Sequence, residues 1–329
     1  MKVLLSGYYG FGNLGDEALL AGLVGALDRC GHEVTVLSAD TGATERLHGV
    51  RARNRYLGLV PAVAASDWVV SGGGGLLQDR TSSRSLRYYL SVLQLARLMG
   101  KRRLVYGQSV GPLSDQGARS VAHALRDTPV AVRDERSLAV LAELGVEAHL
   151  VADPALALTP QAAHLDSEGS VLLIPRAGEP TVTSGLIDLA RRLVGAGTPV
   201  SVLAFHKAQD EPEVAALTRS VPGVRLRQAD SPQGALACLA QARHVVSARL
   251  HGLILAALSG RAQSGIVYDP KVAAFLSEVG LALHEVPLDV DRLLADVAAH
   301  TTADASRVAG LVGRARAGLD WLNAQLASI

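Results

Sequence analysis

The chain has 329 residues, 49% of them hydrophobic and 19% charged, so it can bury more than one domain interior and is neither disordered nor fibrous. Its 32 basic and 31 acidic residues leave a formal charge of +1, so the net charge of the chain does not attract nucleic acid. Any anion site must therefore be local. The only cysteines, Cys30 and Cys238, lack zinc-binding spacing, so we expect a reducing, cytoplasmic compartment and no structural metal.

Short strand-like runs alternate with helical patterns along the whole chain, which is typical of parallel sheets built from βαβ units. The predicted strands of the first half span residues 2–6, 33–37, 67–71, 103–106 and 129–132. After a polar stretch that runs to Gly169 the alternation restarts, with strands near 171–175, 199–205, 223–227, 244–247, 264–268 and 283–286.

This pattern predicts two Rossmann-like, doubly wound α/β domains, residues 1–160 and 161–329. Ligands are expected beyond the carboxyl ends of the strands, in a cleft between the domains. A last helix, from about Ala303 to Leu326, is expected to return to the N-terminal domain and brace the two. No apolar run is long enough for a signal-peptide core or a membrane span.

The first predicted strand leads into GYYGFGNLGDEALL, which fits the dinucleotide-binding pattern GxGxxG at Gly10, Gly12 and Gly15. Asp16 and Glu17 then occupy the first helical turn, where a pyrophosphate needs bare N–H groups and positive potential. Dinucleotide binding is therefore unfavourable, although Asp40 stands near the position of a ribose-binding acid. We predict that Asp16 is a general base and that Glu17 complements the helix dipole.

A second glycine-rich segment, SGGGGLLQD at 71–79, follows the third predicted strand. Successive glycines let backbone N–H groups approach an anion or sugar hydroxyls. A flexible linker is the alternative, and the position at a strand end argues against it. We expect residues of these two loops, namely Asn13, Gly73, Gly74 and Gln78, to line a site for an anion or for sugar hydroxyls.

The next segment, 81–103, predicts a helix that carries tyrosines and several basic residues. A solvated basic face on a core helix is the favoured interpretation, and contact with a membrane interface or a lipid phosphate is the alternative. Arg133 follows a later strand, where a guanidinium can bind a phosphate or carboxylate through two hydrogen bonds. Its alternative is a salt bridge with Asp134 or Glu135.

Cationic residues of the second half gather at adjacent strand ends. HVVSARLHGLILAA predicts a strand, a turn and a helix that carry Arg249 and His251, and IVYDPKVAAFL places Lys271 at the start of the next helix. The helix dipole disfavours a protonated first-turn histidine unless an anion binds nearby, which suits a proton donor coupled to an anionic substrate. A phosphate or carboxylate site is predicted here, and it is extended by residues after other strands: Arg176, His206 and Lys207.

Seven segments in chain order resemble the polysaccharide pyruvyl transferase family, and its CsaB branch most of all: GYYGFGNLGDEA, SGGGGLLQDRTSSRSLRYYL, YGQSVGP, VRDERS, VADPAL, SARLHGL and YDPKVAAFLSEVG. The resemblance spans about residues 3–285. It implies two Rossmann-like domains in a glycosyltransferase-B-like arrangement, with the acceptor on the N-terminal domain and phosphoenolpyruvate on the C-terminal one. One family motif differs: where Leu-Arg-Pro usually stands, this chain has IPRAGEP at 174–180, which keeps Arg176 but not its neighbours.

The resemblance also implies a ketal-forming transferase that moves pyruvate from phosphoenolpyruvate to a sugar and releases phosphate. The typical product is a 4,6-ketal on N-acetylmannosamine in a lipid-linked or polymeric precursor of a cell-wall polysaccharide that anchors an S-layer, made at the inner face of the membrane. His251 fits the acid that protonates the donor's methylene carbon, and Asp16 fits the base for the attacking hydroxyl. Residues placed to hold the donor are Arg133, Arg249, Lys271 and Arg176. Phosphoenolpyruvate is then a co-substrate, and no cofactor or metal is required.

Two other functions stay open from the sequence: a nucleotide-sugar-dependent glycosyltransferase of the same architecture, and a non-catalytic anion-binding protein of the same fold. An NAD-dependent dehydrogenase fits less well because of Asp16 and Glu17.

Overall fold

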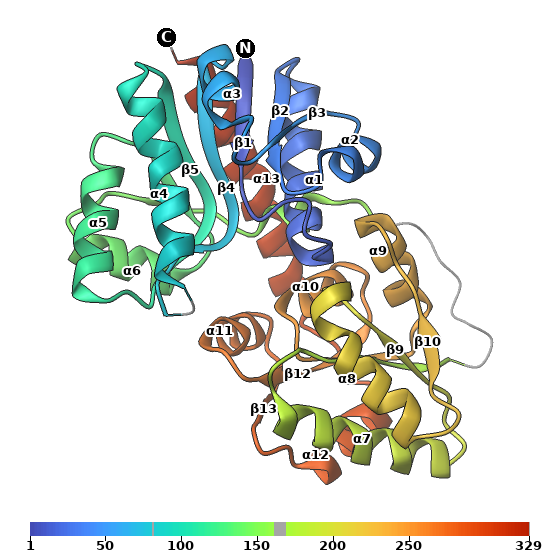
Figure 1. Cartoon of the computed structure of the whole chain (residues 1–329). Helices are drawn as coiled ribbons and strands as arrows, with labels where there is room; N and C mark the ends of the chain where they lie inside the picture. Colours follow the sequence, from blue (N-terminus) through green and yellow to red (C-terminus); the bar gives the residue numbers. More distant parts are fainter. Residues whose placement is uncertain (81, 161–168, 329) are drawn as a thin grey trace. The chain divides into compact units, whose positions relative to one another are not determined.

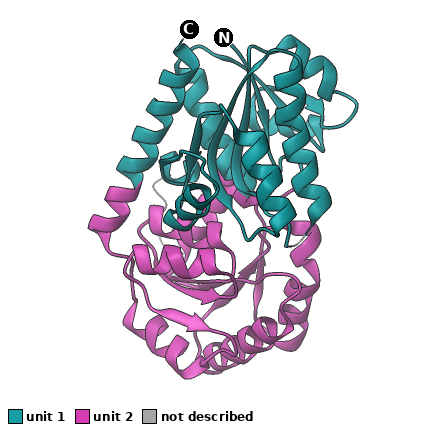
Figure 2. Ribbon diagram, turned by 90° about the vertical axis from the view of Figure 1, so that its left-hand side faces the viewer, with its two compact units in different colours: residues 1–11, 16–158, 312–329 teal, residues 12–15, 159–311 magenta. Residues whose placement is uncertain are grey.

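The computed structural model describes residues 1–80, 82–160 and 169–328 and contains two parallel α/β sheets (Figure 1). The chain separates into two compact units (Figure 2). The first unit comprises residues 1–11, 16–158 and 312–329, and the second comprises residues 12–15 and 159–311. The polar stretch at the expected domain boundary falls on residues 161–168, which lie outside the described residues.

The sheet of the first unit has the strand order β3-β2-β1-β4-β5-β6-β7, and every pair is parallel. Its strands are β1 (Lys2–Ser6), β2 (Glu33–Ser38), β3 (Arg51–Asn54), β4 (Trp68–Leu77), β5 (Arg102–Val110), β6 (Val130–Val132) and β7 (His149–Leu150). The order reverses between β1 and β4, so the loops after these two strands diverge to opposite faces of the sheet. Such a switch point is where open α/β sheets bind ligands.

Helices cover both faces of this sheet. One face packs against α1 (Leu14–Arg29) and the second half of α13 (Ala305–Ala327), whose buried leucines include Leu319 and Leu322. The other face packs against α3 (Leu59–Ala65), α4 (Ser83–Leu98), α5 (Asp115–Leu125) and α6 (Glu135–Glu143). Two shorter elements complete the unit, α2 (Thr41–His48) and the 3₁₀ turn η1 (Pro154–Ala157).

The sheet of the second unit has the order β10-β9-β8-β11-β12-β13, again all parallel. Its strands are β8 (Val171–Ile174), β9 (Val200–Leu203), β10 (Arg225–Arg227), β11 (His244–Ser247), β12 (Ala262–Val267) and β13 (Leu283–Glu285). One face packs against α7 (Pro180–Gly195), α8 (Lys207–Ser220) and α12 (Val290–Ala299). The helix α10 (Leu250–Leu258) contacts both α9 (Pro232–Gln241) and α11 (Pro270–Glu278), and α10 and α11 pack on β12. The switch point lies between β8 and β11.

The predicted fold class, two doubly wound α/β sheets and a C-terminal helix, is confirmed. The prediction missed β3 and β7, which are short strands at the edges of the first sheet and have largely exposed residues. It was also wrong about the end of the third predicted strand. The observed β4 runs through all four glycines to Leu77, so the expected loop at 71–77 is strand, with a bulge after Gly74.

Candidate functional site

The cationic side chains predicted in the second half follow neighbouring strands of one sheet. Arg176 follows β8, Arg249 and His251 follow β11, and Lys271 follows β12. Because β8 and β11 flank the switch point, the loops of Arg176 and Arg249 lie where a doubly wound sheet binds its ligand. The observed strand order therefore brings these four residues to the same end of the second sheet, where the strands finish, as the sequence predicts.

Arg249 is the N-cap residue of α10 and is held by a buried carboxylate. Its guanidinium hydrogen-bonds Asp210 through both Nε, at 3.2 Å, and Nη2. Asp210 is fully buried, whereas the Arg249 side chain keeps 14% of its surface exposed. One edge of the guanidinium is thus fixed by the protein, and the exposed part is left for an anion.

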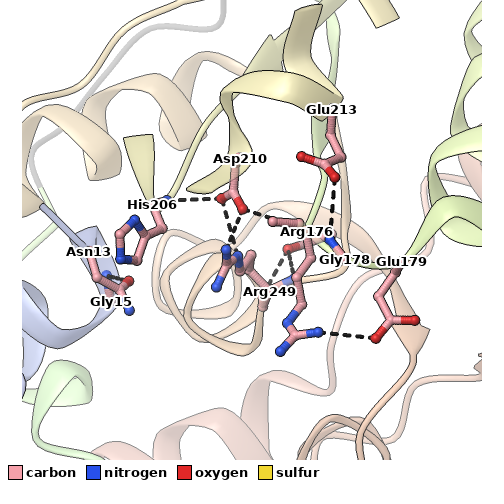
Figure 3. Close-up of polar contacts among 11 residues, drawn as sticks. Asn13, Gly15, Arg176, Gly178, Glu179, His206, Asp210, Glu213 and Arg249 are labelled. Atoms are coloured by element: carbon pink, nitrogen blue, oxygen red, sulfur yellow. Dashed lines mark hydrogen bonds and ion pairs between the residues drawn. The ribbon is translucent and has the colours of Figure 1, made fainter. Parts of the chain in front are cut away.

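The same carboxylate organises three loops (Figure 3). Besides Arg249, Asp210 accepts the backbone N–H of His206, at 2.9 Å, and that of Ala177, at 3.1 Å. His206 follows β9, Ala177 follows β8 and Arg249 follows β11. One buried side chain therefore sets the relative position of the loops at three adjacent strand ends. Without its partners a buried carboxylate would be strongly unfavourable, so the loops and Asp210 stabilise one another.

His206 is buried beside this network and pairs through its backbone with Asn13. Burial lowers the pKa of its imidazole, and the positive charge of Arg249 lowers it further, against a smaller opposing effect of Asp210. The side-chain oxygen of Asn13 accepts the N–H of Gly15 at 3.1 Å and so caps α1. In the same segment the Leu14 N–H donates to the Phe205 carbonyl at 2.8 Å, which fixes residues 13–15 against the end of β9.

His251 occupies the first turn of α10 and packs against the backbone of Gly15. A Cβ atom added to Gly15 would lie 2.3 Å from His251 Nδ1 and 2.6 Å from Cγ. Glycine is therefore required at this position by the imidazole, which gives the third glycine of the GxGxxG pattern a purpose other than cofactor binding. The imidazole is positioned between α10 and the start of α1.

The loop after β8, which carries Arg176, contacts the loop after β12, which carries Lys271. The Arg176 guanidinium lies 4.1 Å from the centre of the Tyr268 ring, and its Nη1 is 3.2 Å from Glu179 Oε1. Lys271, three residues beyond Tyr268, has its Nζ 3.9 Å from Asp269 Oδ2, and both side chains are part-exposed. These contacts leave both cations accessible at the rim of the second sheet.

In the first unit, Asp16 lies on the first turn of α1 against the glycine stretch of β4. A Cβ atom on Gly74, which has φ +84°, would lie 3.1 Å from Asp16 Oδ1. Tyr9 is buried nearby and donates its hydroxyl hydrogen to the Gly72 carbonyl. Burial, together with the negative charges of Asp16 and Glu17, raises the pKa of Tyr9 well above its usual value. Tyr9 is therefore a neutral hydrogen-bond donor, while Asp16 is half-buried.

The glycines of β4 have two different environments. Cβ atoms on Gly72 and Gly73 would lie 2.8 and 3.1 Å from Leu23 and Leu19 of α1, so these two let the helix pack closely on the strand. Gly74 approaches Asp16, and a Cβ on Gly75 would meet only open space. Gly73, Gly74 and Gln78, which follows β4, stay predicted acceptor residues.

Glu17 and Asp40, the other acids near the first loop, are both used structurally. Glu17 is buried, accepts the Gly10 N–H at 2.8 Å and lies 2.8 Å from His48 Nε2. Asp40 caps α2 by accepting the Ala43 N–H. A dinucleotide pyrophosphate would have to displace Glu17 from the loop N–H, which adds to the argument against the dehydrogenase alternative.

Arg133 is buried and pairs with Asp153, at 2.6 Å between Nη1 and Oδ2. Its Nε donates to Ser109 Oγ at 2.8 Å. The expected alternative partner, Asp134, instead caps α6 and accepts from Ser109. The alternative interpretation, a salt bridge with Asp134 or Glu135, is therefore wrong in its partner. Direct donor binding by Arg133 stays a prediction, and its burial in an ion pair favours a positioning role.

Sequence reasoning missed Asp210 and Tyr268. Asp210 lies four residues after His206 in a helix-starting segment, HKAQDEPE, where an acid in the first turn is commonly a dipole-complementing residue. The signal that could have identified it is its position after a predicted strand, next to a predicted anion site. Tyr268 lies in the segment IVYDPKVAAFL, from which only Lys271 was predicted as a site residue.

Comparison with known proteins identifies the family of the chain and proteins of similar structure. Residues 13–270 match the family model described as polysaccharide pyruvyl transferase, and no curated protein sequence matches the chain. Anabaena Alr3699/HepE, solved with UDP-glucose, is similar in structure with a TM-score of 0.67, 12% identity and 100% of both chains covered. The Neisseria meningitidis UDP-GlcNAc 2-epimerase bound to UDP-GlcNAc has a TM-score of 0.63 at 11% identity, with 100% of both chains covered. Acinetobacter baumannii MurG has a TM-score of 0.57 at 12% identity, with 98% of this chain and 99% of that one covered. These likenesses confirm the glycosyltransferase-B-like fold.

Proposed function

Because the chain belongs to the polysaccharide pyruvyl transferase family and is a transferase, we propose that it moves pyruvate from phosphoenolpyruvate to a sugar as a cyclic ketal. The observation that carries the proposal is that four residues follow the carboxyl ends of neighbouring strands in the second sheet: Arg176, Arg249, His251 and Lys271. A phosphate and a carboxylate on one small molecule need several cations beside a proton donor, and these residues supply both.

The proposed reaction uses His251 as the acid. Its proton goes to the methylene carbon of phosphoenolpyruvate, which becomes a methyl group, and the adjacent carbon becomes cation-like. A sugar hydroxyl attacks that carbon and gives its proton to Asp16. The bond from carbon to the phosphate oxygen then breaks, and phosphate leaves with the electron pair and is stabilised by the cationic side chains. A second sugar hydroxyl forms the other C–O bond, and its proton leaves with the phosphate.

Arg249 and Lys271 are proposed to bind the donor. Arg249 is the better positioned of the two, because Asp210 fixes one edge of its guanidinium and so reduces the rotamer entropy lost on binding. Arg176 extends the site over Tyr268. Arg133 is proposed to position the strand ends of the first unit through Asp153 and Ser109.

The acceptor is proposed to be an amino sugar with free 4- and 6-hydroxyls, such as N-acetylmannosamine, in a lipid-linked or polymeric cell-wall precursor. This proposal extends the resemblance to the CsaB branch, in which the modified polysaccharide anchors an S-layer. The residues proposed for the acceptor side are Asp16, Asn13, Gly73, Gly74 and Gln78. Among the described residues no helix is both long and apolar enough to cross a membrane.

Phosphate release from phosphoenolpyruvate, measured with a panel of lipid-linked amino sugars, tests this function. His251→Ala should release phosphate about a hundredfold more slowly or worse, because a positioned acid is lost. His123→Ala, at an exposed position on α5, is the matched control and should behave as the wild type. Equal rates for the two variants would exclude His251 as the acid.

Lys271→Ala separates donor from acceptor binding. The apparent Michaelis constant for phosphoenolpyruvate should rise more than that for the sugar, because Lys271 is proposed to contact only the donor. An equal rise for both substrates would exclude Lys271 as a donor ligand. Turnover with a nucleoside diphosphate sugar in place of phosphoenolpyruvate would instead favour a glycosyltransferase.

A further inference from the structure

We propose that the first unit binds the surface of an anionic membrane through the outer face of α3 and α4. This inference goes beyond the reaction proposed above and does not depend on it. It rests on exposed apolar side chains, on the local charge and on the packing of the two helices.

Exposed large apolar side chains concentrate at the ends of these two helices. In the described residues, seven large hydrophobic side chains are exposed, and five of them belong here: Tyr56, Leu57, Val60, Leu98 and Met99. Leu57 is 89% exposed and Leu98 is 85% exposed. Single exposed apolar residues are ordinary, but five of seven around one pair of neighbouring helices, in one group at the start of α3 and one at the end of α4, indicate an interaction site. We call this set, with the basic residues Arg53, Arg84, Arg87 and Arg97, the α3–α4 surface.

The structure holds the parts of the α3–α4 surface together. Figure 1 shows α3 and α4 on the same side of the first sheet, where Ala62 and Val63 share a core cluster with Val92 and Ala96. The Tyr88 hydroxyl donates to the Arg55 carbonyl at 2.9 Å. At the other end Lys101 Nζ donates to the Ala64 carbonyl at 2.7 Å. Both ends of the surface are therefore fixed.

The loop before α3 is rigid enough to present its apolar tip. Asn54 Oδ1 accepts the N–H groups of Tyr56 and Leu57, at 3.0 and 3.1 Å. The buried guanidinium of Arg55 lies 5.2 Å from the Tyr56 ring centre and 4.1 Å from that of Tyr88. The Tyr56 ring also contacts the Tyr88 ring edge to face, at 5.4 Å between centres. Leu57 is therefore exposed on a loop in which the preceding residues, Arg55 and Tyr56, both contact Tyr88 of α4.

The charge on this surface has one sign, although the whole chain is nearly neutral. Residues 46–66 hold four Lys and Arg residues and residues 80–114 hold seven, with no Asp or Glu in either segment. Arg53, Arg84, Arg87 and Arg97 are all exposed. Three carboxylates near these segments have partners of their own: Glu33 pairs with Arg51, Asp67 accepts the Lys2 N–H, and Asp79 accepts from Ser114.

Basic side chains around exposed apolar ones match the interface of an anionic bilayer. Arginines attract anionic headgroups, and Leu and Tyr insert at the boundary of the acyl chains. A second copy of the chain fits poorly, because a symmetric interface would oppose two acid-free surfaces. Nucleic acid would gain little from the aliphatic tips of Leu57 and Leu98.

Sedimentation of the full chain with vesicles tests the inference. The wild type should bind vesicles that contain phosphatidylglycerol, bind pure phosphatidylcholine vesicles far less, and lose binding as salt rises. Arg84→Gln with Arg87→Gln should weaken binding by about twenty-fivefold, since each removed charge is worth about fivefold. Leu57→Ser should weaken it by about tenfold.

Matched controls lie on the second unit. Leu226→Ser removes an apolar side chain that is 53% exposed on β10, and Arg219→Gln removes an exposed charge on α8, and both should bind as the wild type. A wild type that does not bind the anionic vesicles would overturn the proposal. So would equal losses in the controls, or variants that change the oligomeric state while vesicle binding is unchanged.

Discussion

The contact between Gly15 and His251 permits a test in which the proposed acid itself is not mutated. Gly15→Ala places a Cβ atom 2.3 Å from His251 Nδ1, whereas ordinary contacts of Cβ atoms begin at 3.4 Å. The backbone of residues 13–15 is held by the Leu14 N–H bond to Phe205 and by the pairing of Asn13 with His206. We therefore expect the imidazole to yield, by about 1 Å, which is enough to misplace a catalytic group.

The expected loss follows from that displacement. Misplacement by about 1 Å costs on the order of a hundredfold in rate, equivalent to about 2.7 kcal/mol in the barrier. Stability should change little in comparison, because alanine is favoured over glycine in a helix by up to about 1 kcal/mol and offsets part of the strain. The assay is steady-state phosphate release from phosphoenolpyruvate, together with thermal unfolding.

Gly25→Ala in the same helix is the matched control. A Cβ atom there has Arg29 Nη1 at 3.7 Å as its nearest neighbour, so this variant should be slightly more stable and fully active. Wild-type turnover by Gly15→Ala, with NMR showing a displaced His251 ring, would refute the assignment of His251 as the acid.

Three further outcomes are expected. Asp16→Asn keeps the shape but removes the base, so transfer should fall about a hundredfold or more while calorimetry shows unchanged phosphoenolpyruvate affinity; lost affinity with intact transfer would exclude this role. Asp210→Asn leaves Arg249 without its buried counter-charge and should lower stability by about 3 kcal/mol in denaturant unfolding, the lower end for buried pairs because Arg249 is part-exposed; an unchanged midpoint would contradict the network. Burial lowers the pKa of His244 from 6.5 to about 4, so between these pH values the unfolded state binds a proton that the native state does not. As the pH is lowered from about 6.5 to about 4, stability should therefore decrease by about 1.4 kcal/mol per pH unit, and less steeply in His244→Gln; equal slopes would contradict the assignment.

The buried strands could be predicted because they are apolar on both faces. Runs such as VLLIP and HVVS are typical of parallel strands covered by helices on each side, and the structure has β8 and β11 there. The edge strand β3 has the sequence RARN and buries only Ala52. Its pairing with β2 depends on tertiary contacts and leaves no apolar pattern in the sequence.

The glycine stretch was misjudged for a related reason. Glycine ordinarily weakens a strand, so four in succession indicate a strand end. Two of them, Gly72 and Gly73, are explained by Leu23 and Leu19 of α1, which would lie 2.8 and 3.1 Å from a Cβ atom at these positions. The pairing of β4 with β5 continues through the glycines to Leu77, and neither this pairing nor the helix contact has a local signature in the sequence.

The candidate site was predicted in its cations but not in what holds them. Arg249, His251 and Lys271 follow strands, and the sheet order then makes their loops neighbours. The buried acid that fixes Arg249, Asp210, is 39 residues away in sequence. Arg133 likewise pairs with Asp153, 20 residues away, and not with the adjacent acid. Long-range ion pairs of this kind have no local signature.

The measurement that tests the central claim most directly is product analysis after reaction with phosphoenolpyruvate and an amino-sugar acceptor in deuterated water. The account predicts one phosphate released for each product, a product heavier than the acceptor by pyruvate less one water, and a deuterium in the ketal methyl group from the acid. A sugar that gains no pyruvyl group, or a new product formed only with a nucleoside diphosphate sugar, would contradict it.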